Sequence, residues 1–308
     1  MDSGHETNGR PNRQARAEVI GVIGLGLLGR AIAQRLLKLG YDLVGYDVDP
    51  ERKALASSDG VTIAGCSPEV VGKCDRVILS LPTSEVVENV VDEVSSELRP
   101  GQFLIDTTTG EPDAIAALAD KLAARNVNYL DATVGGSSSQ ARSGEILMLV
   151  GGREDAFAAC RPLLTQMGRQ VCHVGPPGSG AKLKLVHNLV LGLNRAVLAE
   201  GLTFARSLGL DPERALEVLR TSAAYSRVMD QKGKRMVSYN FDPEARLSQH
   251  LKDVRLMLEA GSAAGAHLPL SERHRELLEA IEAAGWGTLD NSAIIRAFEQ
   301  PEPSHVDE

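Results

Sequence analysis

The sequence predicts an α/β fold, a doubly wound, mostly parallel sheet followed by an all-α C-terminal domain. Between Glu18 and about Val174, short β-branched segments alternate with helical patterns, which is typical of βαβ units. After GPPGSG at 175–180 the alternation stops, and no further strand pattern follows. A glycine-rich segment directly follows the first expected strand. Together these three observations predict a Rossmann-type sheet with a helical second domain.

The expected strands mostly end at Gly, Pro or Asp, residues that commonly close a strand. They are 18–24, 41–47, 61–63, 76–82, 103–106, 128–132, 145–150 and 169–174. Continuous apolar stretches such as Ile146 to Val150 are typical of strands covered on both faces. Between the first two strands, apolar residues from Leu28 to Leu39 repeat at helical spacing before Gly40. The first unit is therefore strand, glycine-rich turn, helix and strand.

The C-terminal domain is expected to begin with one long helix from Ala181 to Leu208. Further helices are expected at 211–219, 251–266 and 270–285. Lys184 and Asn188 are four residues apart and share one face of the long helix. The residues expected to face the core are Leu183, Val186, Val190, Leu193 and Val197. The domain bounds are then 1–17 for a disordered tail, 18–177 for a dinucleotide-binding domain, 178–299 for a helical substrate and oligomerisation domain, and 300–308 for a second tail.

Composition excludes several classes of protein. The 308 residues include 33 Lys plus Arg and 41 Asp plus Glu, giving a net charge of −8. This balance offers no basic patch for a phosphate backbone, so a nucleic-acid partner is not expected. No apolar stretch approaches about 18 residues, so no membrane span is expected. The polar N-terminal segment lacks the apolar core of a secretory signal, so we expect a cytoplasmic protein.

Cysteines and histidines give no metal signature. The cysteines are irregularly spaced without a C-x-x-C pair, so we interpret them as reduced core thiols. They are Cys66, Cys74, Cys160 and Cys172. No H-E-x-x-H pattern occurs, and His267 and His274 would at most share one helix face. We therefore expect no metal site.

The glycine-rich segment is Gly24-Leu25-Gly26-Leu27-Leu28-Gly29, which matches G-x-G-x-x-G between a strand and a helix. In such a turn Gly24 allows the tight bend, Gly26 lets backbone approach a pyrophosphate, and Gly29 lets helix and strand pack closely. Without a nucleotide, the same letters would describe only a tight turn in another α/β protein. The strand, the helix and the acidic residue described next favour nucleotide binding.

The acidic residue is Asp47, which ends the second strand eighteen residues after Gly29. A carboxylate at this place accepts hydrogen bonds from the adenosine ribose and repels a 2′-phosphate. Arg52 and Lys53 follow closely and complicate the local charge. We therefore expect NAD as the preferred cofactor and NADP as the alternative.

Two further clusters concern the substrate. Gly135, Gly136 and Ser137 follow a strand, and their backbone N–H groups offer a place for a carboxylate, although a plain serine-rich loop is the alternative. Lys184 and Asn188 point together from the start of the long helix. Moving a hydride to or from a carbon bearing a hydroxyl group requires a proton acceptor or donor, and a lysine with a lowered pKa serves both directions.

At this point the chain resembles the β-hydroxyacid dehydrogenases, which include 3-hydroxyisobutyrate dehydrogenases and tartronate semialdehyde reductases. The resemblance covers roughly Val19 to Phe298 and rests on GLGLLG, VILSLP, IDTTTGEP, DATVGGSSSQARSGEILMLVGG, GSGAKLKLVHN and LKDVRL in the family's order. It implies that Lys184 is the catalytic lysine and that Asn188 binds substrate. The residues that it places at the cofactor, beside Gly24, Leu25, Gly26, Leu28, Gly29 and Asp47, are Leu81, Pro82, Thr109 and Lys252.

The chain departs from the family at two places. Where the family commonly has Ser-Gly-Gly after Ala-Pro-Val, this chain has Gly135-Gly136-Ser137 after Ala-Thr-Val. This version is closer to the sulfolactaldehyde reductases, which however place an arginine where Gly136 stands. His187 occupies the position of the first of two family asparagines, and we interpret it as a local variation.

We therefore expect an oxidoreductase that transfers a hydride between a nicotinamide cofactor and a small β-hydroxyacid or its semialdehyde, with Lys184 as general acid and base. The substrate carboxylate is expected at Gly135, Gly136, Ser137 and Asn188. The alternatives are a non-catalytic nucleotide-binding module acting through protein partners, a sulfolactaldehyde reductase and an imine reductase. Lys184 argues against the first and the last, which lack it. The long helix is apolar on more than one side, which favours a homodimer or homotetramer.

Overall fold

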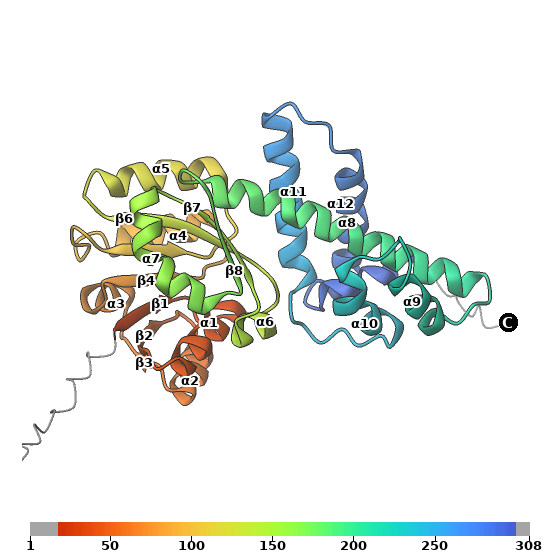
Figure 1. Cartoon of the computed structure of the whole chain (residues 1–308), viewed down its shortest axis with the longest axis horizontal. Helices are drawn as coiled ribbons and strands as arrows, with labels where there is room; N and C mark the ends of the chain where they lie inside the picture. Colours follow the sequence, from red (N-terminus) through yellow and green to blue (C-terminus); the bar gives the residue numbers. More distant parts are fainter. Residues whose placement is uncertain (1–17, 300–308) are drawn as a thin grey trace, which may run out of the picture.

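The computed structural model describes residues 18–299, which form a sheet part and a helical part joined by one long helix (Figure 1). The two expected tails, 1–17 and 300–308, lie outside the described residues.

The sheet part contains one eight-stranded sheet in the order β3-β2-β1-β4-β5-β6-β7-β8. Its strands are β1 (Val19–Ile23), β2 (Asp42–Tyr46), β3 (Thr62–Ile63), β4 (Arg76–Leu79), β5 (Phe103–Asp106), β6 (Asn128–Gly135), β7 (Leu147–Gly151) and β8 (Gln170–Gly175). The first six strands run parallel, and β7 pairs with β6 in the antiparallel direction. β8 pairs with β7 in parallel. The chain thus winds outward from β1 in both directions, which confirms the predicted doubly wound, mostly parallel sheet.

Helices cover both faces of this sheet (Figure 1). They are α1 (Leu27–Lys38), α2 (Pro50–Asp59), α3 (Ser67–Lys73), α4 (Ser84–Glu93), α5 (Pro112–Ala123), α6 (Ser138–Ser143) and α7 (Glu154–Met167). One core cluster joins the sheet to α1, α2, α6 and α7, and a second joins it to α3, α4 and α5. Burial on both faces explains why the strands are continuously apolar rather than alternating.

The helical part begins with α8 (Ser179–Ser207), which starts in the sheet part and continues through the helical part (Figure 1). The elements that follow are α9 (Pro212–Arg220), η1 (Met229–Gly233), α10 (Lys234–Val237), α11 (Leu247–Ala263), α12 (Pro269–Ile281), η2 (Glu282–Trp286) and η3 (Asn291–Phe298). Their shared core includes Leu202, Leu251 and Leu278. Across residues 18–299, every helix is too short or too polar to cross a bilayer.

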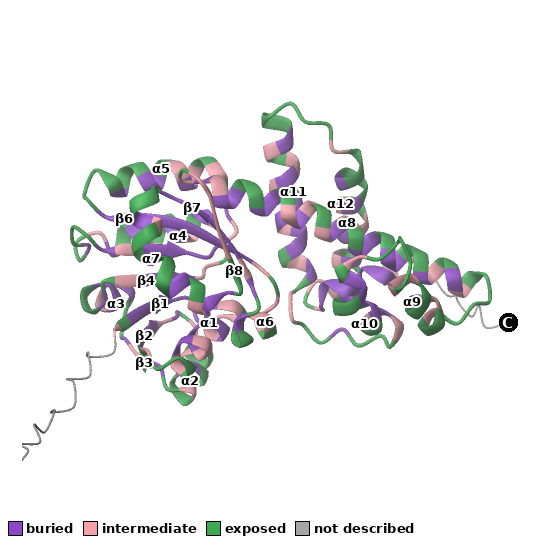
Figure 2. Cartoon of the chain, viewed as in Figure 1, coloured by how far each residue is buried: buried purple, intermediate pink, exposed green. Residues whose placement is uncertain are grey.

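The predicted core face of α8 is wrong. Leu183, Val186, Val190 and Val197 are exposed, Val197 by 68%, while Leu193 is only partly buried. The buried face instead begins with Ala181, Lys184, Leu185 and Asn188. Figure 2 shows that buried and exposed residues alternate along α8. The cause is packing: α8 turns this face toward β6 and α11, which bury the lysine and the amide with it.

Several shorter predictions also need correction. The alternative of a plain serine-rich loop is wrong, because Ser137 is the N-cap of helix α6, which begins at Ser138. The last long helix ends at Ile281, and Gly285 has a φ of 86° in the turn that follows. Cys74 and Cys160 are buried thiols as expected, whereas Cys66 is exposed and Cys172 is half-buried. His267 is exposed, whereas His274 is buried with its ring 5.2 Å from that of His250 on α11.

Candidate active site

The glycine-rich turn has no room for a side chain at two of its three glycines. Gly24 has a φ of 93°, and a Cβ there would lie 2.2 Å from the carbonyl oxygen of Ser80. A Cβ at Gly29 would lie 1.9 Å from the carbonyl oxygen of Gly24, so neither position accepts a side chain. A Cβ at Gly26 would meet only the Arg52 guanidinium at 3.8 Å, so Gly26 faces open space. The turn therefore fits a pyrophosphate at the N-terminus of α1.

Asp47 lies directly beside this turn. Its carboxylate is 5% exposed, and its Oδ2 accepts a hydrogen bond from the N–H of Leu25 at 2.7 Å. Arg52 places Nη1 3.6 Å from the same oxygen. Lys53 is directed elsewhere, because its Nζ lies 5.2 Å from the centre of the Tyr46 ring. Of the two nearby cations, Arg52 is therefore the one that lies beside the Asp47 carboxylate.

The loops after β4 and β5 are joined by a lysine from the helical part. Lys252 on α11 donates hydrogen bonds to the carbonyl oxygens of Pro82 (3.1 Å) and Thr109 (2.6 Å). The N–H of Leu81 donates to Thr108 Oγ1 at 3.1 Å, which links the two loops directly. The structure thus brings the four residues that the resemblance assigned to the cofactor together at the carboxyl ends of adjacent strands.

Lys184 projects from α8 toward the end of β6. It is 7% exposed, and its Nζ donates a hydrogen bond to the carbonyl oxygen of Val134 at 2.5 Å. Burial lowers the pKa of Lys184 to about 8, and nearby Asp253 partly opposes this shift. At neutral pH the side chain therefore holds a proton that it can readily release, as acid-base chemistry requires.

Asn188 is part of a hydrogen-bonded chain that crosses from α8 to α11. Its Nδ2 donates to Asp253 Oδ2 at 2.9 Å, and its Oδ1 lies 3.1 Å from His187 Nδ1. Asp253 Oδ1 is 3.6 Å from Lys252 Nζ, so this chain reaches the cofactor loops. Burial raises the pKa of Asp253, while the two nearby lysines lower it. Sequence reasoning missed Asp253, although its place beside Lys252 in LKDVRL was a usable signal.

The loop after β6 differs from the expectation in one respect. The N–H of Ser137 donates to Gln140 Oε1 at 2.9 Å, and Ser137 Oγ accepts from the N–H of Gln140 at 3.3 Å. This capping box engages the backbone group of Ser137 that was expected to be free for an anion. Gly136 has a φ of 149°, and its N–H has no partner among the described residues.

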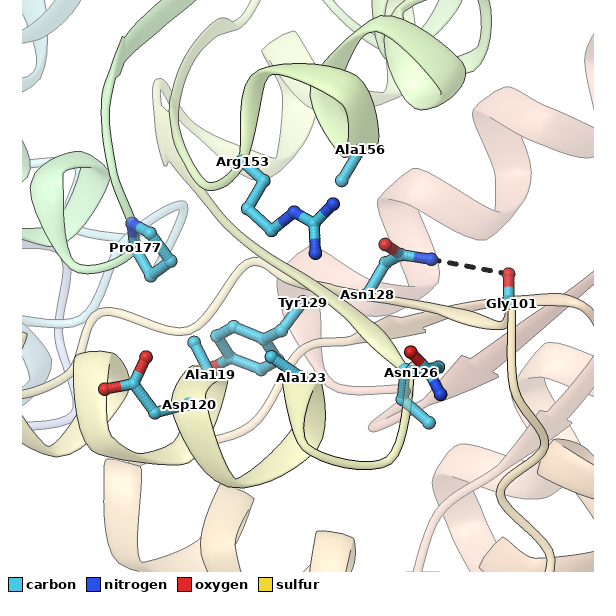
Figure 3. Close-up of a pocket in the computed structure, with 11 residues that line it drawn as sticks. Gly101, Ala119, Asp120, Ala123, Asn126, Asn128, Tyr129, Arg153, Ala156 and Pro177 are labelled. Atoms are coloured by element: carbon cyan, nitrogen blue, oxygen red, sulfur yellow. Dashed lines mark hydrogen bonds between the residues drawn. The ribbon is translucent and has the colours of Figure 1, made fainter.

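A separate hollow of about 300 Å³ lies between α5, β6 and α7 (Figure 3). Arg153, Asn128 and Tyr129 line it, together with Gly101 and Pro177. Gly101 and Asn126 precede β5 and β6, so the hollow opens at the amino ends of these strands, opposite the glycine-rich turn. None of the predicted site residues lines it.

Comparison with known proteins gives matches over nearly all of the described chain. Residues 19–175 match the family described as the NAD binding domain of 6-phosphogluconate dehydrogenase. Residues 178–298 match the family described as NAD-binding of NADP-dependent 3-hydroxyisobutyrate dehydrogenase. The two matches meet within three residues of the place where the sheet ends and α8 begins.

Individual relatives agree with these matches. A 2-(hydroxymethyl)glutarate dehydrogenase from Eubacterium barkeri is 32% identical, over 91% of this chain and 95% of its own length. A 2-hydroxy-3-oxopropionate reductase from Escherichia coli is 29% identical, over 91% of this chain and 97% of its own. A crystal structure of 3-hydroxyisobutyrate dehydrogenase from Salmonella typhimurium superposes with a TM-score of 0.83 at 26% identity, covering 91% of this chain and all of the other. This chain is therefore a member of the β-hydroxyacid dehydrogenase family, an NAD(P)-dependent oxidoreductase acting on CH–OH groups.

Proposed function

We propose that this enzyme interconverts a small β-hydroxyacid and its semialdehyde, with Lys184 as the general acid and base. The observation that carries the proposal is that the Lys184 ammonium group is buried at the end of β6. It lies on the side of the sheet where Lys252 contacts the loops after β4 and β5. Lysines are almost never fully buried without a functional or structural reason. Among residues 18–299 the protonated form donates to one carbonyl oxygen, that of Val134, so two N–H donors remain for a substrate oxygen.

Different residues of the site are proposed to bind the cofactor, transfer the proton and orient the Asn188 amide. The nicotinamide of a bound dinucleotide would supply or accept the hydride. The turn at Gly24–Gly29, Asp47 and the loops of Leu81, Pro82 and Thr109 would hold the dinucleotide. In the reducing direction Lys184 donates its proton to the substrate oxygen as the alcohol forms. In the oxidising direction neutral Lys184 removes the hydroxyl proton. Asp253 accepts a hydrogen bond from the Asn188 amide and so holds that amide in one orientation beside the lysine.

The substrate carboxylate is proposed to bind at Gly135, Gly136 and Ser137 together with Asn188. The unpartnered N–H of Gly136 supports this placement, while Ser137 contributes by fixing the loop through its capping box. Only a few carbons fit between an oxygen at Lys184 and an anion at this loop, because Lys184 already contacts Val134 next to it. No arginine stands at Gly136, which disfavours a sulfonate as the preferred anion.

For the cofactor we propose NAD in preference to NADP. The support is the Asp47 carboxylate beside the N–H of Leu25, because an acidic residue at the end of the second strand of such a fold repels a 2′-phosphate. The opposing feature is Arg52, which stands next to that carboxylate. Because all four cysteines are unpaired, we also propose a reducing, cytoplasmic location.

For assembly we propose a homodimer or homotetramer, formed by residues 178–299. Exposed apolar side chains follow the face of α8 that is turned away from Lys184, and a monomer would leave them in water. They are Leu183, Val186, Val190, Val197 and Phe204.

The decisive test is a substrate panel with purified protein. Three- to five-carbon β-hydroxyacids and their semialdehydes are each offered with NAD(H) and NADP(H), and reduced nicotinamide is followed by absorbance. We expect turnover of at least one carboxylated substrate. Turnover of imines or of sulfonated aldehydes alone contradicts the proposal, and cofactor binding without any turnover favours the non-catalytic module.

A further inference from the structure

His187 lies against a glycine at the edge of the proposed site. A Cβ placed on Gly135 would be 3.2 Å from Nε2 of His187 and 3.3 Å from its Cε1. The imidazole therefore occupies space that a side chain at position 135 would need. Gly135 has an ordinary backbone conformation, so the glycine is explained by the ring rather than by a left-handed φ.

The neighbours of the ring fix which nitrogen carries the proton. Asn188 donates through Nδ2 to Asp253 Oδ2, so its amide oxygen faces His187. That oxygen accepts, and Nδ1 of the neutral ring must therefore donate to it over 3.1 Å. Nε2 is then left with a free lone pair, and it has no hydrogen-bond partner among residues 18–299.

This lone pair is close to the reacting centre. His187 follows Lys184 by three residues on α8, and Gly135 follows Val134, whose carbonyl oxygen accepts from Lys184. The ring is only half-buried, and both burial and the Lys184 cation lower the pKa of His187, which keeps the ring neutral near pH 7. A substrate bound between Lys184 and the loop thus meets a hydrogen-bond acceptor at this edge.

We propose that His187 determines substrate specificity by accepting, at Nε2, a hydrogen bond from a second hydroxyl group on the carbon that bears the carboxylate. This inference rests on the proposed function. It makes the preferred substrate a dihydroxylated acid rather than one with a hydrogen or methyl group at that carbon. A methyl group would face the lone pair and leave it unpaired, which is the situation that polar sites reject most strongly.

The test compares two substrates that differ only at this carbon. Glycerate carries a hydroxyl group there, and 3-hydroxyisobutyrate carries a methyl group of similar size. We expect the wild-type kcat/KM to favour glycerate by at least about tenfold. His187→Leu should lower this ratio by about tenfold or more, mainly through the loss of glycerate turnover. His187→Gln, whose amide oxygen still accepts, should retain part of the ratio.

A control variant and a second test variant show whether the contact is direct. The control, His267→Leu, removes an exposed histidine 80 residues after His187 and should leave the kcat/KM ratio of the two acids unchanged. Gly135→Ala places a methyl group against the ring and should lower the ratio by displacing Nε2. Combined with His187→Leu, it should add little, because both changes remove the same contact.

The outcomes are distinguishable. Equal loss of both substrates in His187→Leu, or an unchanged ratio, overturns the specificity role while the proposed function stands. A wild-type preference for 3-hydroxyisobutyrate overturns it as well. Failure of the wild type to turn over either acid, while another β-hydroxyacid of the panel is turned over, overturns the specificity role alone. Failure with every acid of the panel overturns both proposals.

Discussion

Replacing Lys184 with alanine removes the proposed proton donor and acceptor. A pKa of about 8 leaves about a tenth of the lysines neutral at pH 7, against roughly 0.03% at the ordinary value of 10.5. Burial therefore raises the population of the base form by about 300-fold. We expect Lys184→Ala to reduce kcat by about 10²- to 10⁴-fold, the usual contribution of general acid-base catalysis.

The pH dependence provides a second measurement on the same residue. Oxidation needs neutral Lys184, so its rate should rise about tenfold per pH unit below pH 8 and then level. Reduction needs the protonated form, so its rate should stay constant below pH 8 and fall above it. Both dependences should disappear in Lys184→Ala. Lys184→Arg should also be nearly inactive, because guanidinium keeps its proton.

Lys182 provides a matched control, because it is an exposed lysine on the same helix. Lys182→Ala should keep wild-type rates. Titration with NAD(H) and thermal unfolding should show that Lys184→Ala still binds cofactor and folds, since burying the cation is costly rather than stabilising. Activity of Lys184→Ala within tenfold of wild type, or an unchanged pH profile, would refute the catalytic assignment.

Three further predictions concern cofactor, stability and assembly. NAD(H) should bind more tightly than NADP(H) in titrations of the purified protein, and Asp47→Ala should reduce that preference; tighter NADP(H) binding would instead assign the phosphate to Arg52. Burial holds the pKa of His274 at about 4, below its ordinary 6.5, so the unfolded state takes up this proton first. As the pH falls from 6.5 to 4, titration of His274 should therefore lower the free energy of unfolding by up to roughly 3 kcal/mol. In chemical denaturation, the free energy of unfolding of His274→Phe should fall by that much less over the same pH range. Light scattering at micromolar concentration should show a dimer or tetramer, with Val197→Glu shifting the protein toward monomer; a monomeric wild type contradicts the assembly proposal.

The sheet and the glycine-rich turn were predictable because their causes are local. Gly24 is needed for the positive φ of the turn, and Gly29 is needed because it packs against the carbonyl oxygen of Gly24 within the same βα unit. The Leu25–Asp47 hydrogen bond joins residues separated by only 22 positions. Strand patterns of β-branched residues likewise report burial on both faces wherever the strand lies. Such features are readable from sequence because the residues that explain them lie close together along the chain.

The orientation of α8 was not predictable in this way. The helix carries apolar residues on several sides, so periodicity alone favoured the face of Val186 and Val190, which is exposed. The face with Lys184 and Asn188 is buried by Val134, 50 residues earlier, and by Asp253, 65 residues later. Motif order singled out the lysine and the amide, but only tertiary packing shows that both are buried and that the His187 ring lies against Gly135.

The position of Lys184 is set by a rigid joint between β6 and α8. Asp131 in β6 accepts hydrogen bonds from the N–H groups of Gly178 (3.0 Å) and Ala181 (2.9 Å). A Cβ at Gly180 would lie 2.4 Å from the carbonyl oxygen of Asp131, so backbone meets backbone at this point. Lys184 follows Ala181 by three residues, and Val134 follows Asp131 by three. The joint therefore brings the ammonium group to the start of the Gly135 loop, and both are held by a strand and a helix rather than by a mobile segment.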